Sequence, residues 1–588
     1  MENWVMRTVN GSYLEWAEKL GMEPLVLRVL QNRGVSSFEE ARDFLAADLS
    51  TLPDPALLPD LEQAVTVLGR ALDAGERIRI IGDYDVDGVT SVYILLRSLR
   101  FLGGDADARI PHRILDGYGM NERLVREAAA EGASLILTCD NGISASPQIA
   151  LAYELGMRVV VTDHHEPPFE TLPDGSTQQI LPKAEAVVNP KIEGCRYPER
   201  EICGAMVAFL LMQALFAKRD PEGWQRLQPE LLQIAALGTA CDVMPLLGGN
   251  HTVVKEGLRL LRTAPHPGLK TLATVTGVWP DKINMHALGF VLGPCINATG
   301  RLEEAQLALD LLLALEEPER VRMAQRLKEL NEERKRMTEE GVARAQEELE
   351  RRGAYDDPVY LIYLPEVHES LAGIIAGRIR EKYGHPTIVL TKGEHGAKGS
   401  GRSIPAYHMQ QHLQQISDIF QAFGGHAMAA GMSLEQSRVE ELRERLNSTA
   451  DLREEDFAEK VSLDAEVPLG SVTLRLAEAL EALEPCGTGN PAPLFAKRGL
   501  ILTGCRHFGQ DGKYTTFTLR DGDRTCQMKY FGDRASFEEA LTGRFGAGAL
   551  EDLERGRGSF PFTAAYRIQV NEFRGNRSAE LLLQRFIL

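Results

Sequence analysis

Short β-branched runs that end in polar clusters are the dominant pattern of the first half of the chain. Residues 77–81 (RIRII) end at an aspartate-rich segment, and the same form recurs at 134–144 and 158–165. A fourth apolar run covers 186–190, and helix-type spacing lies between the runs. This alternation predicts βα units and a mainly parallel sheet. Ligands of such sheets collect at the carboxyl ends of the strands, where each polar cluster falls.

Helical patterns flank this predicted sheet. Residues 1–70 are typical of short helices broken by Gly and Pro, and we expect an N-terminal helical segment there. Residues 303–352 consist almost wholly of helix formers. We expect an interruption at Pro318, because proline lacks the backbone N–H that a helix interior needs. The stretch is therefore predicted to be a long helical connector between two lobes.

A second α/β pattern and then a β-rich pattern follow the connector. The second lobe combines two strand-like runs, DPVYLIYL and PTIVL, with the helical AGIIAGRIREKYG. It also carries two glycine-rich stretches, GAKGSGRSIP and FGGHAMAAG. From about residue 461, strand-like runs at short spacing predict a small barrel or sandwich. Residues 543–558 are expected to form a loosely fitting loop within it.

Length and composition narrow the class of protein. A chain of 588 residues exceeds one hydrophobic core, and 44% hydrophobic with 25% charged residues is typical of globular domains. The first residues lack the basic segment and the following apolar segment of an export signal, so export is not expected. Eight scattered cysteines without a C-x-x-C pair disfavour a zinc site or disulfide scaffold and predict a cytoplasmic location. The net charge of −19 does not exclude a local basic channel.

An aspartate cluster is the first feature that carries chemistry. Asp83, Asp85 and Asp87 stand within five residues, and such carboxylates repel each other unless a cation neutralises them. An EF-hand loop also begins D-x-D-x-D-G, but its twelfth residue must be Glu. Ile94 occupies that position, in an apolar helix pattern. The other alternative, a solvated acidic turn, is disfavoured because the cluster directly follows a strand of the buried type.

Three further polar sites follow predicted strands or helices. Asp140 precedes Asn-Gly and would by itself indicate a turn. In Asp163-His164-His165, adjacent side chains of an extended segment point to opposite sides, so we expect one histidine on a metal ion and the other facing a substrate phosphate. Asp242 ends an apolar helical run. Carboxylates with one imidazole favour Mn²⁺ or Mg²⁺, and two such ions clamp a scissile phosphate. The sequence therefore predicts a metal-dependent phosphoryl hydrolase.

These motifs, taken in order, resemble those of a known family. GDYDVDGVTS, TCDNGIS, TDHH and GTACDVMPL are similar to successive motifs of the DHH phosphoesterase superfamily. GPCINATGR, SGRS, FGGHAMAAG and PCGTGNPAPLF are similar to those of its RecJ family of single-strand-specific 5′ exonucleases. The resemblance covers about residues 50–588.

The resemblance implies an α/β multidomain protein. After an N-terminal helical segment at 1–70, it implies a DHH catalytic domain with a parallel sheet at 71–302 and a helical connector at 303–352. A DHH-associated, nucleic-acid-binding α/β domain would follow at 353–455, and a C-terminal β-barrel, an OB-fold, at 456–588.

The resemblance also implies a function. The expected reaction is degradation of single-stranded DNA from its 5′ end to 5′-mononucleotides with two Mn²⁺ or Mg²⁺ ions, in recombination and repair. A helicase and a single-strand-binding protein are the expected partners, and we expect a monomer without membrane association. An oligoribonuclease or small-nucleotide phosphodiesterase of the same superfamily is the alternative, but it would need neither the connector nor the β-rich C-terminus. A catalytically dead DNA-binding scaffold would have lost its ligands, whereas here every expected one is present.

Site residues follow from the same resemblance, motif by motif. The implied metal ligands are Asp83, Asp85, Asp87, Asp140, His164 and Asp242, with Asp83 either a ligand or a partner of one. His165 would contact the scissile phosphate or assist the water, and Asp163 would orient a histidine. The implied DNA-phosphate contacts are Arg301, Ser400, Arg402, Gly424, Gly425 and His426. Bare backbone N–H groups in FGGHAMAAG suit a phosphate, although a glycine turn that packs two elements is the alternative.

Some residues depart from the family pattern. Val367-His368-Glu369-Ser370 stands where Trp-His followed by Gly is usual, and His251 and Cys295 stand where arginines are expected. In the C-terminal region, aromatic residues alternate with cations, which suits sequence-independent binding of a single strand. The aromatic residues are Phe508, Tyr514, Phe517, Tyr530 and Phe531. About half of these five are expected in the barrel core.

Overall fold

The structure is a computed structural model and describes residues 3–172, 174–393 and 396–588. The chain divides into two compact units. Unit 1 comprises Pro53–Met244 and Glu256–Glu459. Unit 2 comprises the described residues up to Leu52, together with Pro245–Lys255 and Lys460–Leu588. Among the described residues, no helix has the length and apolar character needed to cross a membrane.

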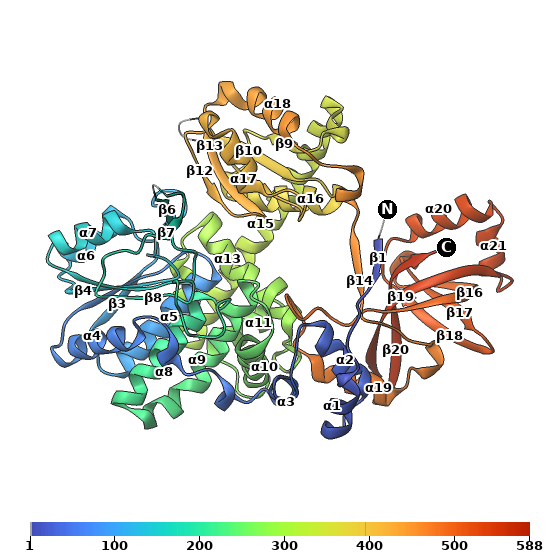
Figure 1. The fold of residues 1–588 in the computed structure, drawn as a ribbon, viewed down its shortest axis with the longest axis horizontal. Helices are drawn as coiled ribbons and strands as arrows, with labels where there is room; N and C mark the ends of the chain where they lie inside the picture. The colour runs from blue at the N-terminus through green and yellow to red at the C-terminus, as the bar shows by residue number, and fades with distance from the viewer. Residues whose placement is uncertain (1–2, 173, 394–395) are drawn as a thin grey trace. The chain divides into compact units, whose positions relative to one another are not determined.

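Five parallel strands form the first sheet of unit 1, in the order β3-β2-β4-β5-β8 (Figure 1). Their bounds are β2 (Ile78–Ile81), β3 (Ala106–Arg109), β4 (Leu135–Cys139), β5 (Arg158–Thr162) and β8 (Ala186–Val188). Almost every residue of β2, β4 and β5 is buried, as in parallel sheets covered on both faces. The predicted parallel sheet is confirmed. The edge strand β3 was not predicted, because its sequence Ala-Asp-Ala-Arg lacks a β-branched run.

Helices cover both faces of this sheet. One face packs against α6 (Glu122–Ala130) and α7 (Ser146–Glu154) through a shared apolar cluster. The other face carries α4 (Leu61–Asp73), α5 (Val86–Phe101) and α8 (Gly204–Arg219) (Figure 1). Helix α9 (Pro221–Cys241) packs against both α5 and α8, which explains why these two helices are apolar on nearly every side.

Three helices lead from the first sheet to the second. They are α13 (Gly293–Leu302), α14 (Gln306–Leu313) and α15 (Glu317–Arg352). The expected interruption at Pro318 is wrong in position, because Pro318 lies in the first turn of α15, where no N–H is required. The break comes earlier, at the extended Ala314. Helix α15 ends at Gly353, which adopts the left-handed conformation.

The second sheet of unit 1 has the order β12-β13-β11-β10-β9. Its strands are β9 (Tyr360–Tyr363), β10 (Thr387–Gly393), β11 (Gly396–Arg402), β12 (Ala422–Gly425) and β13 (Ala429–Leu434). Helix α16 (Ala372–Tyr383) and the C-terminal part of α15 share an apolar cluster with β9 and β10. Both glycine-rich stretches are strands: the first forms β11, and the second forms the β12–β13 hairpin.

A closed five-stranded barrel forms the core of unit 2. The strands follow the order β16-β17-β18-β20-β19, and β16 also pairs with β19. They are β16 (Phe495–Phe508), β17 (Tyr514–Asp521), β18 (Arg524–Tyr530), β19 (Phe560–Phe573) and β20 (Asn576–Ile587). The predicted barrel is confirmed, but the loop expected at 543–558 is wrong. Helices α20 (Arg534–Phe545) and α21 (Ala549–Glu554) occupy most of it, because Leu541 and Leu553 are buried in the barrel core.

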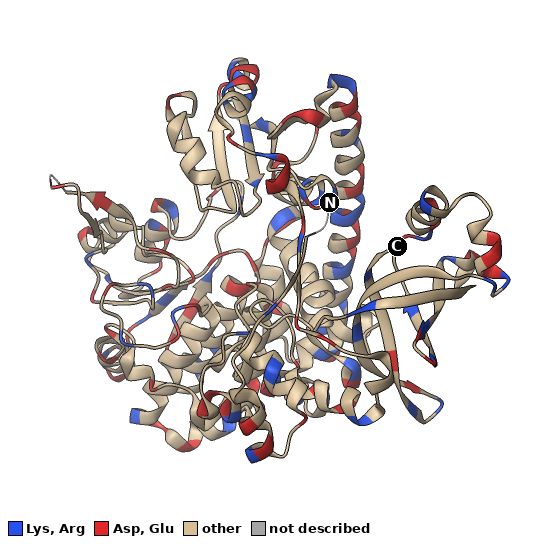
Figure 2. Cartoon of the chain, turned by 45° about the vertical axis from the view of Figure 1, so that its right-hand side comes forward, with Lys and Arg blue, Asp and Glu red and all other residues tan. Residues whose placement is uncertain are grey.

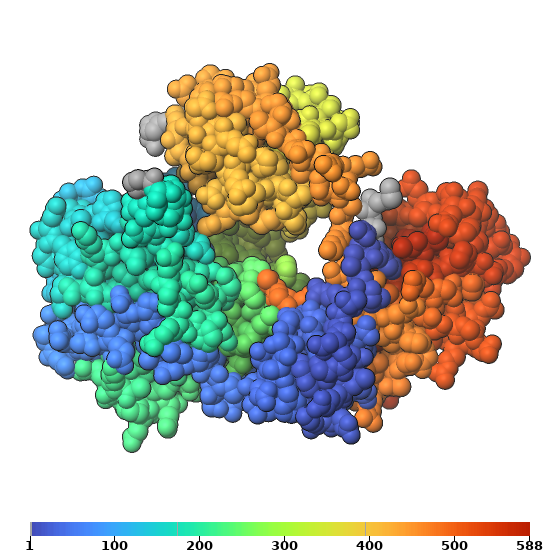
Figure 3. Space-filling model, in the orientation of Figure 1, coloured from blue at the N-terminus to red at the C-terminus, as the bar shows by residue number. Residues whose placement is uncertain are grey.

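The N-terminal residues belong to the same compact unit as the barrel. Strand β1 (Asn3–Met6) pairs in parallel with β14 (Lys460–Leu463), so the predicted helical segment also contains a strand. Arg33 forms a buried ion pair of 2.6 Å with Asp464. In Figure 3 the N-terminal residues, in blue, accordingly lie against C-terminal residues, in orange.

Candidate metal centre

The aspartate cluster lies between β2 and α5. Asp85 caps α5, and its side chain accepts a hydrogen bond of 3.0 Å from the Gly88 N–H. A Cβ at residue 88 would overlap the Asp83 carbonyl, so only glycine permits this tight turn. Ile94 is fully buried within α5, which leaves no twelfth ligand for an EF-hand loop.

Asp87 is fixed by the N-terminus of α8. Its two carboxylate oxygens accept hydrogen bonds from the Gly204 N–H (2.6 Å) and the Ala205 N–H (2.9 Å). The positive end of a helix favours a carboxylate at this position. A Cβ at residue 204 would lie 2.8 Å from the Asp140 Cβ and 3.0 Å from Asp87 Oδ2. Gly204 and Ala205 were not predicted as site residues, because their only signal in the sequence is a pair of small residues at the start of an apolar helix.

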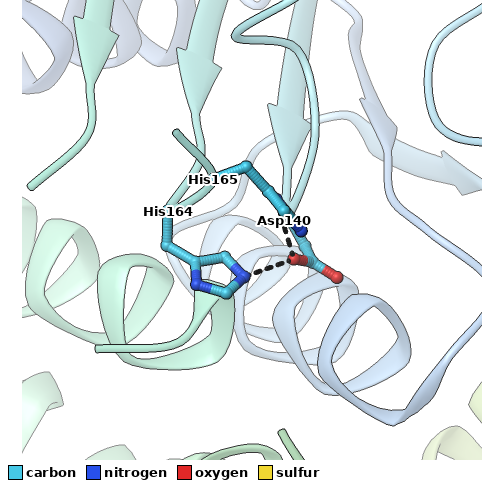
Figure 4. Close-up of side chains that lie close together, drawn as sticks. All are labelled: Asp140, His164 and His165. Carbon is cyan, nitrogen blue, oxygen red and sulfur yellow. Dashed lines mark hydrogen bonds and ion pairs between the residues drawn. The ribbon is translucent and has the colours of Figure 1, made fainter. Parts of the chain in front are cut away.

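Asp140 lies at the centre of the cluster. It follows β4 and has a left-handed backbone with φ of +59°. His164 Nε2 lies 3.0 Å from Asp140 Oδ1, 3.5 Å from Asp87 Oδ2 and 3.7 Å from Asp242 Oδ2 (Figure 4 shows Asp140 with both histidines).

Three groups of side chains each bring their ligand atoms within 4.8 Å of one another. The groups are Asp83, Asp85 and Asp140; Asp87, His164 and Asp242; and Asp140, His164 and His165. All six residues named as metal ligands from the sequence are thus brought together at one edge of the sheet.

Both histidines of the triplet face this cluster. The expectation that they point to opposite sides is wrong, because the segment after β5 is not extended. The Asp163 carboxylate accepts hydrogen bonds from the backbone N–H groups of His164 (2.7 Å) and His165 (3.1 Å), which turns the chain. The His165 Nδ1 atom lies 2.8 Å from Asp163 Oδ1 and 3.9 Å from Asp140 Oδ1. Both oxygens of Asp163 are thus engaged, since Oδ2 also accepts a hydrogen bond of 2.9 Å from the Ile143 N–H.

Negative charge accumulates in the cluster, and among the described residues no Lys or Arg lies within 4.0 Å of its carboxylates. Burial, followed by the charges of Asp87, Asp85 and Asp83, raises the pKa of Asp140 well above its usual range. Burial, followed by the charges of Asp87 and Asp85, raises the pKa of Asp242 to about 9. Asp242 Oδ2 is buried and lacks a hydrogen-bond partner. Buried, mutually repulsive carboxylates with an orphaned oxygen and an imidazole suit a hard divalent cation such as Mn²⁺ or Mg²⁺.

Tyr118 is a site residue that sequence reasoning did not find. Its hydroxyl donates a hydrogen bond of 2.5 Å to the Asp140 carbonyl and lies 3.1 Å from His165 Nδ1. The residue lies in an irregular loop after β3, where no periodic pattern marks it.

The residues named as phosphate contacts lie around α16 and β12. Arg301 is partly buried at the end of α13, and its Nη1 donates to the Ser370 carbonyl at 2.6 Å. Burial, followed by the charges of Arg113, Arg334 and Arg402, lowers the pKa of Arg301 to about 9. Arg402 Nη1 donates to Ser400 Oγ at 2.8 Å.

The β12–β13 hairpin supplies a bare backbone surface in the same sheet. Gly424 and Ser400 are the two cross-strand neighbours of Gly431, so the three residues form one row. A Cβ at Gly424 or Gly431 would meet nothing within 4 Å. Gly425 has a φ of +148°, and the exposed His426 follows it in the turn.

The residues that depart from the family pattern make the following contacts in this chain. His251 is buried and stacks on Phe44 with ring centroids 3.7 Å apart. Cys295 is buried and accepts a hydrogen bond of 3.4 Å from Asn331 Nδ2. His368 Nδ1 lies 2.7 Å from the hydroxyl of Ser370, whose carbonyl receives Arg301.

Comparison with known proteins identifies the family. Family models match at 77–239 (DHH family, N-terminal domain), 356–451 (DHHA1 domain) and 463–585 (RecJ OB domain). The single-stranded-DNA-specific exonuclease RecJ of Salmonella typhimurium is 34% identical over 590 residues, which cover 96% of this chain and 95% of that protein. The chain belongs to the RecJ family.

Two other RecJ proteins extend beyond the part that this chain matches. The RecJ of Bacillus subtilis is 36% identical over 86% of this chain, which spans 62% of the length of that protein. The crystal structure of Thermus thermophilus RecJ in complex with Mn²⁺ matches 100% of this chain and 79% of its own, with a TM-score of 0.80 and 28% identity.

Proposed function

We propose that this chain is a metal-dependent exonuclease that degrades single-stranded DNA from the 5′ end to 5′-mononucleotides, in recombination and repair. The observation that carries the proposal is the buried carboxylate and imidazole cluster at the carboxyl ends of β2, β4 and β5. Support comes from RecJ relatives that are named single-stranded-DNA-specific exonucleases, and from RecJ structures in complex with Mn²⁺ and Mg²⁺.

Two ions of Mn²⁺ or Mg²⁺ fit the ligand sets. Asp83, Asp85 and Asp140 would hold one ion, and Asp87, His164 and Asp242 the other, with Asp140 close enough to serve both. When bound, such ions supply charge neutralisation at the scissile phosphate and a water of lowered pKa.

His165 and Asp163 are proposed to act on the substrate side of the cluster. Asp163 orients the His165 ring through Nδ1, which leaves Nε2 to face a phosphate oxygen or the attacking water. Tyr118 steadies the same ring and the left-handed Asp140 backbone.

Phosphates of the strand are proposed to bind between α16 and β12. Gly373 lies in the first turn of α16. A Cβ at this position would lie 3.0 Å from Ser400 Oγ and 2.7 Å from Arg402 Nη2, so Gly373, Ser400 and Arg402 share one polar surface. Helix N-termini and bare glycine backbone both favour a close phosphate. Arg301, Gly424, Gly425 and His426 complete this proposed surface.

The barrel of unit 2 is proposed to stack bases. Three rings, Phe508, Tyr514 and Phe531, lie with centroids 5.0 to 5.7 Å apart, and Lys513 Nζ lies 5.6 Å from the Tyr514 ring. Aromatic platforms beside cations suit sequence-independent binding of a single strand. Phe517 is fully buried in the core instead.

We also propose the domain bounds given above, with the catalytic domain at 71–302 and the DHH-associated domain at 353–455, since each contains a matched family model. A monomer in the cytoplasm is proposed, and the eight free cysteines support a reducing compartment. A helicase that opens duplex DNA, with a single-strand-binding protein, would supply the substrate.

End-labelled DNA tests the function directly. Single- and double-stranded substrates labelled at either end are incubated with Mn²⁺ or with EDTA. Mononucleotides released from 5′ ends of single strands, only with metal, are the expected products. Release from 3′ ends, or equal activity on blunt duplex, would contradict the proposal. Short RNA and dinucleotide substrates in parallel test the alternative, an oligoribonuclease or small-nucleotide phosphodiesterase.

A further inference from the structure

Helix α15 neutralises most of its own arginines. Six of its eight arginines have a carboxylate within 4.0 Å, as the alternation of blue and red along α15 in Figure 2 illustrates. The six are Arg322, Arg326, Arg336, Arg344, Arg351 and Arg352. Arg320 donates to the backbone carbonyls of Ala314 and Leu315 instead. Arg334 is the exception that neither pattern covers.

Arg334 has an uncharged partner because its sequence neighbours are uncharged. The residues three and four positions away on the helix are Leu330, Asn331, Met337 and Thr338, and acids at these spacings would be needed for a pair. Its Nε and Nη2 donate to Asn331 Oδ1 at 3.1 and 2.9 Å. The neighbouring Arg336, by contrast, pairs with Glu340 at 2.9 Å.

The Asn331 amide fixes Arg334 against α13. Asn331 is buried, and its Nδ2 donates to Cys295 Sγ on α13, the helix whose last turn carries Arg301. The guanidinium of Arg334 is therefore oriented by two hydrogen bonds, and its Nη1 has no hydrogen-bond partner among the described residues.

Four arginines, Arg113, Arg301, Arg334 and Arg402, are connected through α13 and the start of α16. Arg334 is joined to α13 through Asn331 and Cys295. Arg301 on α13 donates to Ser370 just before α16, and Arg402 adjoins Gly373 in the first turn of α16. Arg113 Nε donates to the Gly300 carbonyl at 3.2 Å, next to Arg301. After burial, the other three arginines are the largest causes of the lowered pKa of Arg301. Across the described ranges of the chain, no carboxylate lies within 4.0 Å of any of the four. Mutually repulsive cations without an ion-pair partner indicate a place for an anion.

We infer that Arg334 is a further substrate-binding residue, which contacts a phosphate of the bound strand from the connector helix. This inference rests on the proposed function and gives α15 a part in the site beyond linking two sheets. A planar guanidinium with free donors suits a phosphate oxygen pair. The phosphate is either the terminal 5′-phosphate or an internal phosphodiester, since both present the same chemistry.

Kinetics of Arg334→Ala and Arg334→Gln test the inference, with Arg336→Ala as the matched control on the same helix. Single-stranded oligonucleotide is digested with Mn²⁺ at several NaCl concentrations. For both Arg334 variants we expect KM to rise about tenfold with kcat within about twofold, and the salt dependence of binding to lose about one charge. Arg336→Ala should match the wild type. The Gln variant retains an N–H donor for Asn331 and guards against loss of folding in the Ala variant.

Two substrate arms identify the phosphate. A KM increase on 5′-phosphorylated DNA alone assigns Arg334 to the terminal phosphate, and an increase on 5′-hydroxyl DNA as well assigns it to an internal one. An unchanged KM and salt dependence on both substrates would overturn the inference. Failure of the wild type to degrade single strands would instead refute the proposed function, and fluorescence anisotropy with the same oligonucleotides would still measure the Arg334 contact.

Discussion

Replacing Gly204 by Ala places a methyl group against two of the candidate metal ligands. The added Cβ would lie 2.8 Å from the Asp140 Cβ and 3.0 Å from Asp87 Oδ2, whereas unstrained carbon contacts begin near 3.5 Å. One of the two aspartates must therefore move by roughly half an ångström to one ångström. Misplacement of about 1 Å costs about 100-fold in rate. Overpacking by one methyl group costs only about 1–3 kcal/mol of stability.

We therefore expect Gly204→Ala to lose about 100-fold in kcat at saturating Mn²⁺ while it remains folded. The measurement is exonuclease turnover on single-stranded DNA over a Mn²⁺ titration, with thermal unfolding as the check on folding. Gly289→Ala is the matched control, because a Cβ at this helical glycine meets nothing within 4 Å. If folded Gly204→Ala retained wild-type kcat, the N-terminus of α8 would not be what positions Asp87, and the reasoning would be wrong.

Three further predictions address the central ligand, the N-terminal residues and acid stability. Asp140→Ala should abolish turnover yet leave binding of single-stranded DNA within a few-fold in anisotropy; surviving turnover would exclude Asp140 as a shared ligand. Arg33→Ala should destabilise unit 2 by about 3–5 kcal/mol in urea unfolding, because Asp464 would keep a buried charge without its partner; a loss below 1 kcal/mol would contradict this. Burial, the first cause in each case, lowers the pKa of His266 to about 4 and that of His251 to about 3, so folding favours the neutral rings. The contribution of each neutral ring to the free energy of unfolding is complete above the unfolded pKa of 6.5. It is lost as pH falls toward the folded pKa, with about 2 kcal/mol lost per ring at pH 5. Urea unfolding at pH 7.5 and 5 measures it, and His251→Phe should remove one ring's share; an unchanged pH dependence in that variant would refute the assignment.

The sheet and its ligands could be predicted because they depend on local patterns. Strands β2, β4 and β5 are apolar runs, and a parallel sheet brings their carboxyl ends to one edge. That rule alone places Asp83, Asp140 and Asp163 near one another before any distance is known. The barrel was predictable for the same reason, since its strands alternate in burial.

The remaining site residues depend on contacts that leave no local pattern. The Asp87 carboxylate is held by backbone N–H groups 117 and 118 residues further along the chain, and backbone donors carry no side-chain signature. Tyr118 comes from an irregular loop, and Arg334 resembles every other arginine of α15 until its neighbours are mapped. The triplet after β5 was misjudged because Asp163 turns the backbone, which an assumption of extended geometry ignores.

Net charge fails as a guide to substrate in this chain for a structural reason. Four of the ten glutamates of α15 lie within 4.0 Å of arginines of the same helix, so these pairs add little to the field at the site, whereas the total of −19 is summed over the whole chain. What remains unbalanced is local: buried carboxylates at the sheet edge, and four arginines for which no carboxylate among the described residues lies within 4.0 Å. Divalent ions would cancel the first set, and a phosphate strand would cancel the second. A polyanion can reach a carboxylate cluster only if both compensations occur together, which is the physical reason for the proposed phosphate surface to adjoin the candidate metal centre.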